Sequence, residues 1–247
     1  IDIDKSSMLS AIVNMAYMGV GAINWTGGGE PTLHPDLNEF IEKAHRYGFR
    51  QGIFTNAISV DHAIASPGKL SWIRVSITNG YLNSLNKNLV REYAEKTRVG
   101  ICMNLTLDDD SFTLAKHAKE LGCAYFQVRP ALTQRFEDQS QIDIPYFLKE
   151  LETDSFKINL SEYKFSDCMA AKSYDECYGG QWCPIIDYNG NVCWCNYHLG
   201  DSKYVIGNIN EESFSEIYAR FPTSFVVEDD CMNCCKNHEI NKLLYEI

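Results

Sequence analysis

The stretch Val20-Gly21-Ala22-Ile23-Asn24-Trp25-Thr26-Gly27-Gly28-Gly29-Glu30-Pro31 decides the fold, because it joins an apolar run to a glycine loop that a helical pattern follows directly. Three consecutive glycines remove every Cβ from the turn, so backbone N–H and C=O groups can approach a small ligand, and Glu30 adds a carboxylate beside them. The loop therefore suits a ligand that carries an ammonium group. A bare tight turn that requires positive φ would explain the glycines equally well.

The chain repeats this order of strand, loop and helix. Apolar and alternating runs predict strands at residues 49–54, 71–77, 99–107 and 124–128. Helical periodicity predicts helices at residues 7–18, 35–47 and 112–121, the last two ending at Gly48 and Gly122. Strands that alternate with helices imply a parallel sheet with crossover helices, and the carboxyl ends of such strands carry the chemistry.

The glycine loop resembles that of the radical S-adenosylmethionine (SAM) enzymes, whose partial (β/α)6 barrel carries a Gly-Gly-Glu motif after its second strand. Gly28, Gly29 and Glu30 match this motif by residue and by position. The resemblance implies an α/β fold with a partial (β/α)6 TIM-like barrel, in which the loop holds the methionyl amino group of SAM.

The same resemblance implies that residues at the ends of later strands hold the ribose and the carboxylate of SAM. The residues at comparable positions are Thr55, Asn56, Ser76 and Arg129. Ser76 could equally be an ordinary strand hydroxyl, and Arg129 could pair with one of many surface carboxylates. The sequence assigns no side chain to a catalytic role.

The family signature, three cysteines spaced C-x3-C-x2-C after the first strand, does not occur before Gly28, and the first cysteine of the sequence is Cys102. In the family these thiolates hold three irons of a [4Fe–4S] cluster and leave the fourth iron open to SAM. We expect the first strand and its cysteines to precede residue 1, with residues 1–18 forming the end of the cluster loop and the first helix. The stretch 77–99 is short for a crossover helix with loops, so we expect residues to be absent there too. The alternative is a degenerate relative without SAM chemistry.

Composition fits a cytosolic globular enzyme. Of 247 residues, 45% are hydrophobic and 22% are charged, which is enough for one barrel domain and a small second domain. A run of about 18 apolar residues is absent, so we expect no membrane span and a cytoplasmic location. The net charge of −11 argues against nucleic-acid binding, which needs clustered Lys and Arg to neutralise phosphates.

The placement of the cysteines is the second strong signal. Cys102 and Cys123 lie in apolar, strand-like surroundings that favour buried and inert thiols. The other eight of the ten cysteines fall between Cys168 and Cys235, a density typical of metal ligands in a reducing compartment or of disulfides in a secreted protein. The neighbouring barrel favours metal.

The spacing from Cys177 through Gly190 to Cys195 is C-x12-G-x4-C, which is similar to the opening of the SPASM and twitch extensions of radical SAM enzymes. Asn189-Gly190 predicts a hairpin turn between two β-rich runs. With the chelating pair that follows downstream, the predicted ligands of one auxiliary iron–sulfur cluster are Cys177, Cys195, Cys231 and Cys234. The longer SPASM pattern would continue C-x5-C-x3-C, but its next position falls on Ile240, so a twitch-like domain with one cluster is the better match.

Several alternatives stay open for the cysteine region. Cys235 could replace Cys234, and Cys193 shares a strand face with Cys195 because side chains alternate with period two. Four thiolates that include a C-x2-C pair also fit a structural zinc site. Cys168 and Cys183 have no evident role, and their spacing adds nothing to either hypothesis.

These patterns predict three segments: the barrel at residues 1–135, a linker and bridging helix at 136–176, and an auxiliary-cluster domain at 177–247. The resemblance implies reductive cleavage of SAM to a 5′-deoxyadenosyl radical, which abstracts hydrogen from a substrate. It implies an electron donor such as flavodoxin or ferredoxin, and a small-molecule or peptide substrate. The rival hypothesis is a noncatalytic iron–sulfur or zinc protein that transfers electrons or holds a partner.

Overall fold

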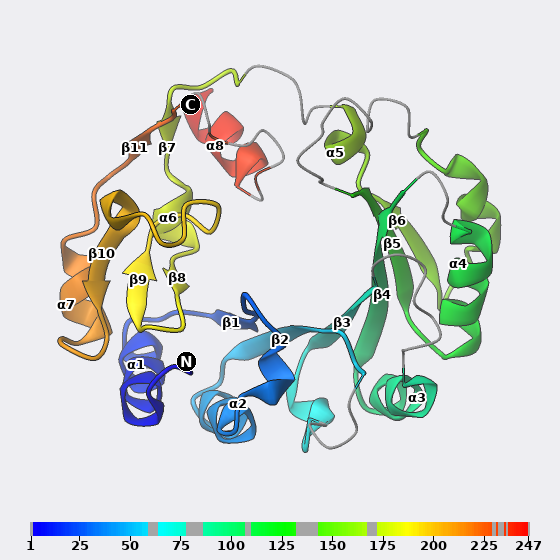
Figure 1. The fold of residues 1–247 in the computed structure, drawn as a ribbon, viewed down its shortest axis with the longest axis horizontal. Coiled ribbons are helices and arrows are strands. Elements are labelled where there is room, and N and C mark those ends of the chain that lie inside the picture. The colour runs from blue at the N-terminus through cyan, green and yellow to red at the C-terminus, as the bar shows by residue number, and fades with distance from the viewer. Residues whose placement is uncertain are drawn as a thin grey trace. The chain divides into compact units, whose positions relative to one another are not determined.

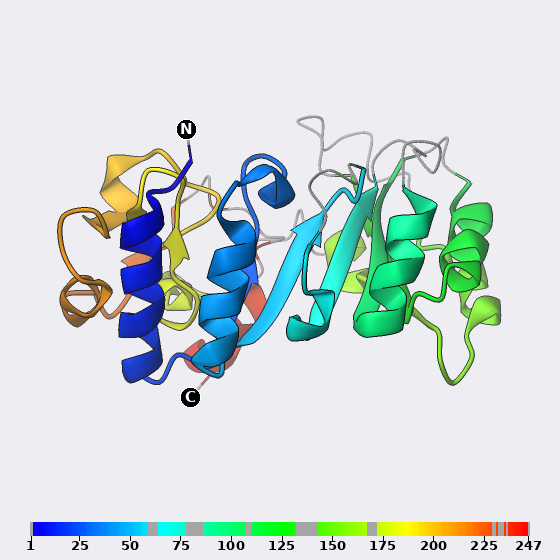
Figure 2. The same ribbon diagram turned by 90° about the horizontal axis from the view of Figure 1, so that it is seen from below.

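The computed structural model describes residues 2–58, 64–77, 86–106, 110–131, 143–166, 172–228, 231, 235 and 237–246. The chain forms two compact units. One consists of Ala22–Ser166, and the other combines Ile1–Gly21 with Asp167–Ile247. Figure 1 and Figure 2 show the elements of each unit in two views.

The first unit is built on a six-stranded parallel sheet whose strands follow one another in chain order. Its strands are β1 Ala22–Trp25, β2 Arg50–Thr55, β3 Trp72–Ile77, β4 Arg98–Leu105, β5 Tyr125–Pro130 and β6 Lys157–Leu160. The predicted parallel α/β sheet is confirmed. The sequence did not predict β6, because a strand of four residues gives too short a pattern to separate from a loop.

Helices α2 Leu37–Arg46, α3 Lys87–Lys96 and α4 Ser111–Glu120 lie on one side of this sheet (Figure 1). They contact β2, β4 and β5, respectively. The unit also contains α5 Glu162–Ser166 and short 3-10 helices at Pro31–Leu33, Pro67–Lys69 and Tyr146–Leu151.

The stretch 77–99 holds a crossover helix, α3, which begins where the Asn86 side chain accepts a hydrogen bond from the Leu89 N–H at 3.1 Å. The expected absence of residues from this stretch stays a prediction. Residues 78–85 lie outside the described part of the chain. Helix α2 begins at Leu37 rather than at Pro35, and the N–H of its N-cap residue Asp36 donates to His34 Nδ1 at 3.1 Å.

Successive side chains of each strand point to opposite faces of the sheet. The side chains directed at the helices are apolar except for Gln51 and Thr55, and the fully buried ones are Ile53, Ile73, Val75, Ile101, Phe126 and Val128. This period-two burial forms the core of the unit, and each of these side chains contributes about 1.5–3 kcal/mol through removal from water.

The second unit joins the first helix to the cysteine-rich region. Helix α1 Lys5–Tyr17 contacts α7 Phe214–Ala219, and the Ser215 hydroxyl donates to Asn14 Oδ1 at 3.3 Å. The contacts thus divide the chain in a different way from the three predicted segments, whose boundaries stay a prediction. Much of the predicted linker, residues 136–142 and 167–171, lies outside the described residues.

A three-stranded antiparallel sheet forms the centre of the cysteine-rich region, with strands β8 Ile185–Ile186, β9 Asn191–Cys193 and β10 Val205–Asn208. The predicted hairpin turn is confirmed, since Gly190 adopts a φ of 83° and Asp187 Oδ1 accepts the N–H groups of Asn189 and Asn191 at 2.8 and 2.9 Å. Strand β7 Glu176–Cys177 pairs with β11 Phe225–Val226. The remaining elements are α6 Gly179–Trp182, a 3-10 helix at Ser202–Tyr204 and α8 His238–Tyr245.

Among the described helices, none has the length and apolar character that a membrane span requires.

Candidate functional site

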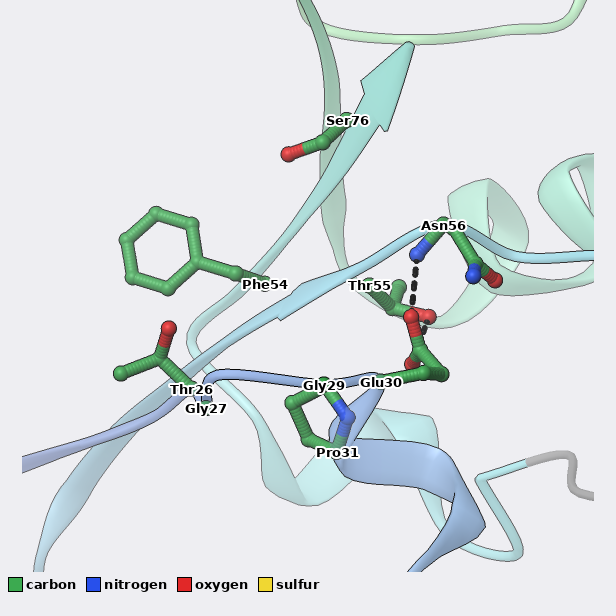
Figure 3. A pocket seen from close by; sticks show the side chains of 9 residues that line it. All are labelled: Thr26, Gly27, Gly29, Glu30, Pro31, Phe54, Thr55, Asn56 and Ser76. Atoms are coloured by element: carbon green, nitrogen blue, oxygen red, sulfur yellow. Dashed lines mark hydrogen bonds between the residues drawn. The ribbon is translucent and has the colours of Figure 1, made fainter. Parts of the chain in front are cut away.

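A pocket of about 240 Å³ lies at the carboxyl ends of β1, β2 and β3. Figure 3 shows its lining, which consists of Thr26, Gly27, Gly29, Glu30, Pro31, Phe54, Thr55, Asn56 and Ser76. Ligands of parallel α/β sheets bind at this end of the strands. Pockets that enclose a whole drug-sized ligand measure roughly 300–1,000 Å³, so this pocket suits one end of a ligand.

Most of the residues predicted to bind SAM meet in this pocket. Glu30, Thr55, Asn56 and Ser76 all line it together with the glycine loop. Gly28 belongs to the same loop without being part of the lining.

Arg129 is not part of the lining either. Its Nε donates to Asn104 Oδ1 at 2.7 Å, so its described partner is an amide on the neighbouring strand β4 rather than a surface carboxylate. A role for Arg129 in binding SAM stays a prediction.

The Glu30 carboxylate ties the glycine loop to the end of β2. Its Oε1 accepts hydrogen bonds from the Thr55 hydroxyl at 2.6 Å and from the Thr32 hydroxyl and N–H at 2.8 and 3.1 Å. Its Oε2 accepts the Asn56 N–H at 2.7 Å, as the dashed lines of Figure 3 indicate. Because a carboxylate offers about four acceptor positions, the remaining capacity lies on Oε2. Glu30 therefore positions the loop, a function that the sequence did not reveal.

The loop glycines are not required by the fold. Neither Gly28 nor Gly29 has a positive φ, and a Cβ built on either would meet no atom within 4 Å. A Cβ on Gly27 would make ordinary contacts, at 3.4 Å and beyond, with the backbone of Gly29. The alternative explanation of a turn that demands positive φ is thus wrong. The open space above these backbone groups favours a ligand that approaches them closely.

Sequence reasoning missed Phe54 as a lining residue. It precedes Thr55 on β2, so its side chain lies on the opposite face of the strand. Only the strand register, which pairs Phe54 with Arg74 of β3, shows which neighbours it meets. Thr26 and Pro31 flank the predicted motif and could have been included by proximity alone.

The second site collects four thiols of the cysteine-rich region. Cys177, Cys195, Cys231 and Cys235 are close enough to act on one another electrostatically. Burial raises the pKa of the Cys235 thiol to about 11, and the other three cysteines add to the increase. Thiolates collected in this way repel one another unless a cation neutralises them, so the set fits a metal or an iron–sulfur cluster.

Three of these sulfurs accept N–H groups. Asn241 Nδ2 donates to Cys177 Sγ at 3.3 Å, and the Asn237 N–H donates to Cys235 Sγ at 3.4 Å. Burial raises the pKa of the Cys195 thiol, and hydrogen bonds from the N–H groups of Tyr197 and His198, two and three residues further on, act against that increase. Hydrogen bonds to ligand sulfurs tune iron–sulfur clusters, so these donors fit that chemistry.

The other cysteines are arranged differently. Cys234 and Cys168 lie outside the described residues, so the choice between Cys234 and Cys235 as a ligand stays open. Cys193 is buried, and its Sγ contacts the Asn191 carbonyl at 3.8 Å. Cys102 and Cys123 are buried, as predicted. In the described parts of the chain, no three His, Cys, Asp or Glu side chains already stand in metal-binding geometry.

Residues 177–236 match the SPASM family, an iron–sulfur cluster-binding domain. Over 184 residues the chain is 27% identical to an S-adenosylmethionine-dependent nucleotide dehydratase of Flammeovirga pacifica. This alignment covers 65% of this chain and 61% of that protein. The chain carries a C-terminal SPASM domain, and the two matches confirm its resemblance to the radical SAM enzymes. The SPASM match favours iron–sulfur over zinc, while the number of auxiliary clusters stays a prediction.

The fold of this chain is similar to that of SuiB from Streptococcus suis. The TM-score is 0.66 for SuiB and 0.64 for SuiB bound to S-adenosylmethionine, at 14% identity in both cases. The likeness covers 88% of this chain and 60% and 59% of the two SuiB chains. A third structure, of SuiB bound to its precursor peptide SuiA, gives 0.61. The chain thus spans about three fifths of the length of these relatives.

Proposed function

We propose that this protein cleaves SAM reductively and uses the 5′-deoxyadenosyl radical to abstract a hydrogen atom from a substrate. The observation that carries the proposal is the loop of Gly27 to Glu30. The fold does not require its glycines, their backbone is open to a ligand, and the Glu30 carboxylate fixes the loop in place. When bound, a [4Fe–4S] cluster supplies the electron that breaks the S–C5′ bond of SAM.

The residues of the pocket have separate tasks in this proposal. Backbone carbonyls of the glycine loop and the remaining acceptor position of Glu30 receive the methionyl ammonium group. Thr55, Asn56 and Ser76, at the ends of the next two strands, hold the ribose and the carboxylate. Arg129, two strands further along the sheet, reaches the same ligand from the far side. Their shared task is to orient SAM and to keep water away from the reacting atoms.

The cysteine-rich unit holds the auxiliary cluster in this proposal. Its ligands are Cys177, Cys195 and Cys231, with Cys234 or Cys235 as the fourth. A flavodoxin or ferredoxin of a reducing cytoplasm supplies the electrons. The SAM-dependent relative is named for a nucleotide, and SuiB binds a precursor peptide, so both classes are candidate substrates.

The proposal is tested by anaerobic reconstitution of the full-length protein with iron and sulfide, followed by iron counting and electron paramagnetic resonance with and without SAM. We expect about eight irons per chain, a signal that changes when SAM is added, and 5′-deoxyadenosine after reduction. About four irons, no response to SAM and no 5′-deoxyadenosine would overturn it in favour of a noncatalytic iron–sulfur protein.

A further inference from the structure

The sheet face opposite helices α2, α3 and α4, here called the inner face, is basic in an acidic protein. Along β1 to β6, its described positions include no Asp or Glu, and its basic residues are Arg50, Arg74, Arg98, Arg129 and Lys157. The whole chain, by contrast, has 33 acidic and 22 basic residues. A cationic surface beside a pocket raises the local concentration of anionic ligands.

Two aromatic rings cover part of this face. A Cβ on Gly52 would lie 2.0 Å from the Trp72 indole, and a Cβ on Gly100 would lie 2.0 Å from the Tyr125 ring, so each ring lies over the backbone of a glycine on the neighbouring strand. Arg74 is in register with Gly100, so it lies level with the Tyr125 ring.

Arg74 is held in a fixed orientation next to the pocket. Its guanidinium lies 4.0 Å from the centre of the Phe54 ring, and its Nη1 donates to Gln127 Oε1 at 3.1 Å. Gln127 is fixed in turn, because its Nε2 donates to Ser161 Oγ at 3.0 Å. Phe54 also lines the pocket, and Ser76 of the lining is two residues beyond Arg74 on β3.

The charge of Arg74 acts on the neighbouring side chains of this face. Burial raises the pKa of the Tyr125 phenol, and the guanidinium of Arg74 acts against that increase. An arginine fixed in this way loses little conformational freedom when it binds a ligand, and its planar fork matches phosphate or carboxylate oxygens. The inner face carries several basic residues and no Asp or Glu in its described strands, which suits a group with more than one negative charge and so favours phosphate.

We infer that the inner face binds a phosphate group of the substrate, with Arg74 as the contacting residue and Phe54 and Gln127 as its positioning residues. The inference rests on the proposed function, because it places the substrate beside the SAM pocket. It assigns the substrate to phosphorylated molecules rather than to neutral ones.

The experiment is isothermal titration calorimetry of the full-length protein, with and without SAM, using ATP, GTP, CTP, UTP, the corresponding nucleosides, pyrophosphate and glutarate as probes. We expect at least one triphosphate to bind more tightly than its nucleoside, and Arg74→Gln to weaken that binding about tenfold or more. Arg74→Lys should restore part of the affinity, because it keeps the charge without the fork. Arg91→Gln is the matched control, since Arg91 is exposed on α3.

Equal binding by Arg74→Gln and the unchanged protein would overturn the inference, as would equal weakening by Arg91→Gln. Binding of glutarate alone would overturn the assignment to phosphate. Thermal unfolding and SAM titration of each variant show whether the fold and the pocket persist. Because these titrations need no electron transfer, a protein that binds triphosphate through Arg74 but never cleaves SAM would refute the proposed activity and leave the binding site standing.

Discussion

The Glu30 carboxylate accepts a hydrogen bond of 2.6 Å from the Thr55 hydroxyl, which joins the glycine loop after β1 to the end of β2. Thr55 is 3% exposed, and its hydroxyl also accepts the Ala57 N–H at 3.0 Å. The bond thus connects the loop that lines the pocket to the buried part of the sheet. The geometry of the pocket depends on this pair before any ligand arrives.

Glu30→Gln should weaken SAM binding about tenfold or more and lower the free energy of unfolding by about 1–3 kcal/mol. The amide replaces one acceptor oxygen with an NH2 group, which then faces a donor, either the Thr55 hydroxyl or the Asn56 N–H. Urea unfolding and SAM titration measure the two effects. Glu120→Gln, on the exposed end of α4, serves as the control, and unchanged SAM affinity in Glu30→Gln would contradict the anchoring function.

Alanine substitutions should separate glycines that serve a ligand from glycines that serve the fold. Gly29→Ala has open space for its Cβ, so we expect a stability change within about 0.5 kcal/mol but a loss of SAM affinity. Gly52→Ala drives a Cβ into the Trp72 indole and should cost about 1–3 kcal/mol. Trp72→Ala should relieve part of that cost in the double variant, as a double-mutant cycle would measure. A destabilised Gly29→Ala would return the loop to a structural explanation.

The Cys123 thiol should resist alkylation in the folded protein. Burial raises its pKa to about 12, from 9.0, so at pH 8 the folded chain holds about a thousandfold less thiolate than the unfolded chain. The folded state keeps the proton while the unfolded state loses it near pH 9, so this residue lowers stability as the pH rises from 9 towards 12. Peptide mapping after iodoacetamide treatment, with and without urea, measures the protection. Partly exposed Cys183 is the internal standard, and equal labelling of both residues in the folded protein would contradict the burial.

The sheet could be predicted from the sequence because apolar and polar residues alternate regularly along its strands. Residues such as Ile73 and Val75 alternate with Arg74 and Ser76, and each run is followed by a helical pattern. The pocket was predicted for a related reason, since Thr55, Asn56 and Ser76 all stand at strand ends, which a parallel sheet brings together.

What the sequence could not give depends on pairing between distant segments. Whether the Glu30 carboxylate faces a ligand or the protein is decided by Thr55, 25 residues away. The contact of Arg74 with Phe54 and Gln127 likewise needs the strand register. The apolar stripe of α1 predicts burial but does not say against which unit, and the structure groups it with α7.

Serine substitutions of the clustered cysteines should reveal the ligands of the auxiliary cluster. Cys177→Ser and Cys195→Ser each remove a thiolate whose sulfur accepts hydrogen bonds from N–H groups. Each variant should therefore lose about four of the expected irons while the SAM-sensitive signal remains.

The variants Cys234→Ser and Cys235→Ser identify the fourth ligand, because only the variant of the true ligand should lose iron in the same way. Burial and the Asn237 N–H would suit Cys235 to that position, whereas spacing alone favours Cys234. Iron counting and electron paramagnetic resonance provide the measurement, with Cys123→Ser as the control, and full iron content in Cys177→Ser would remove this site from the protein's metal chemistry.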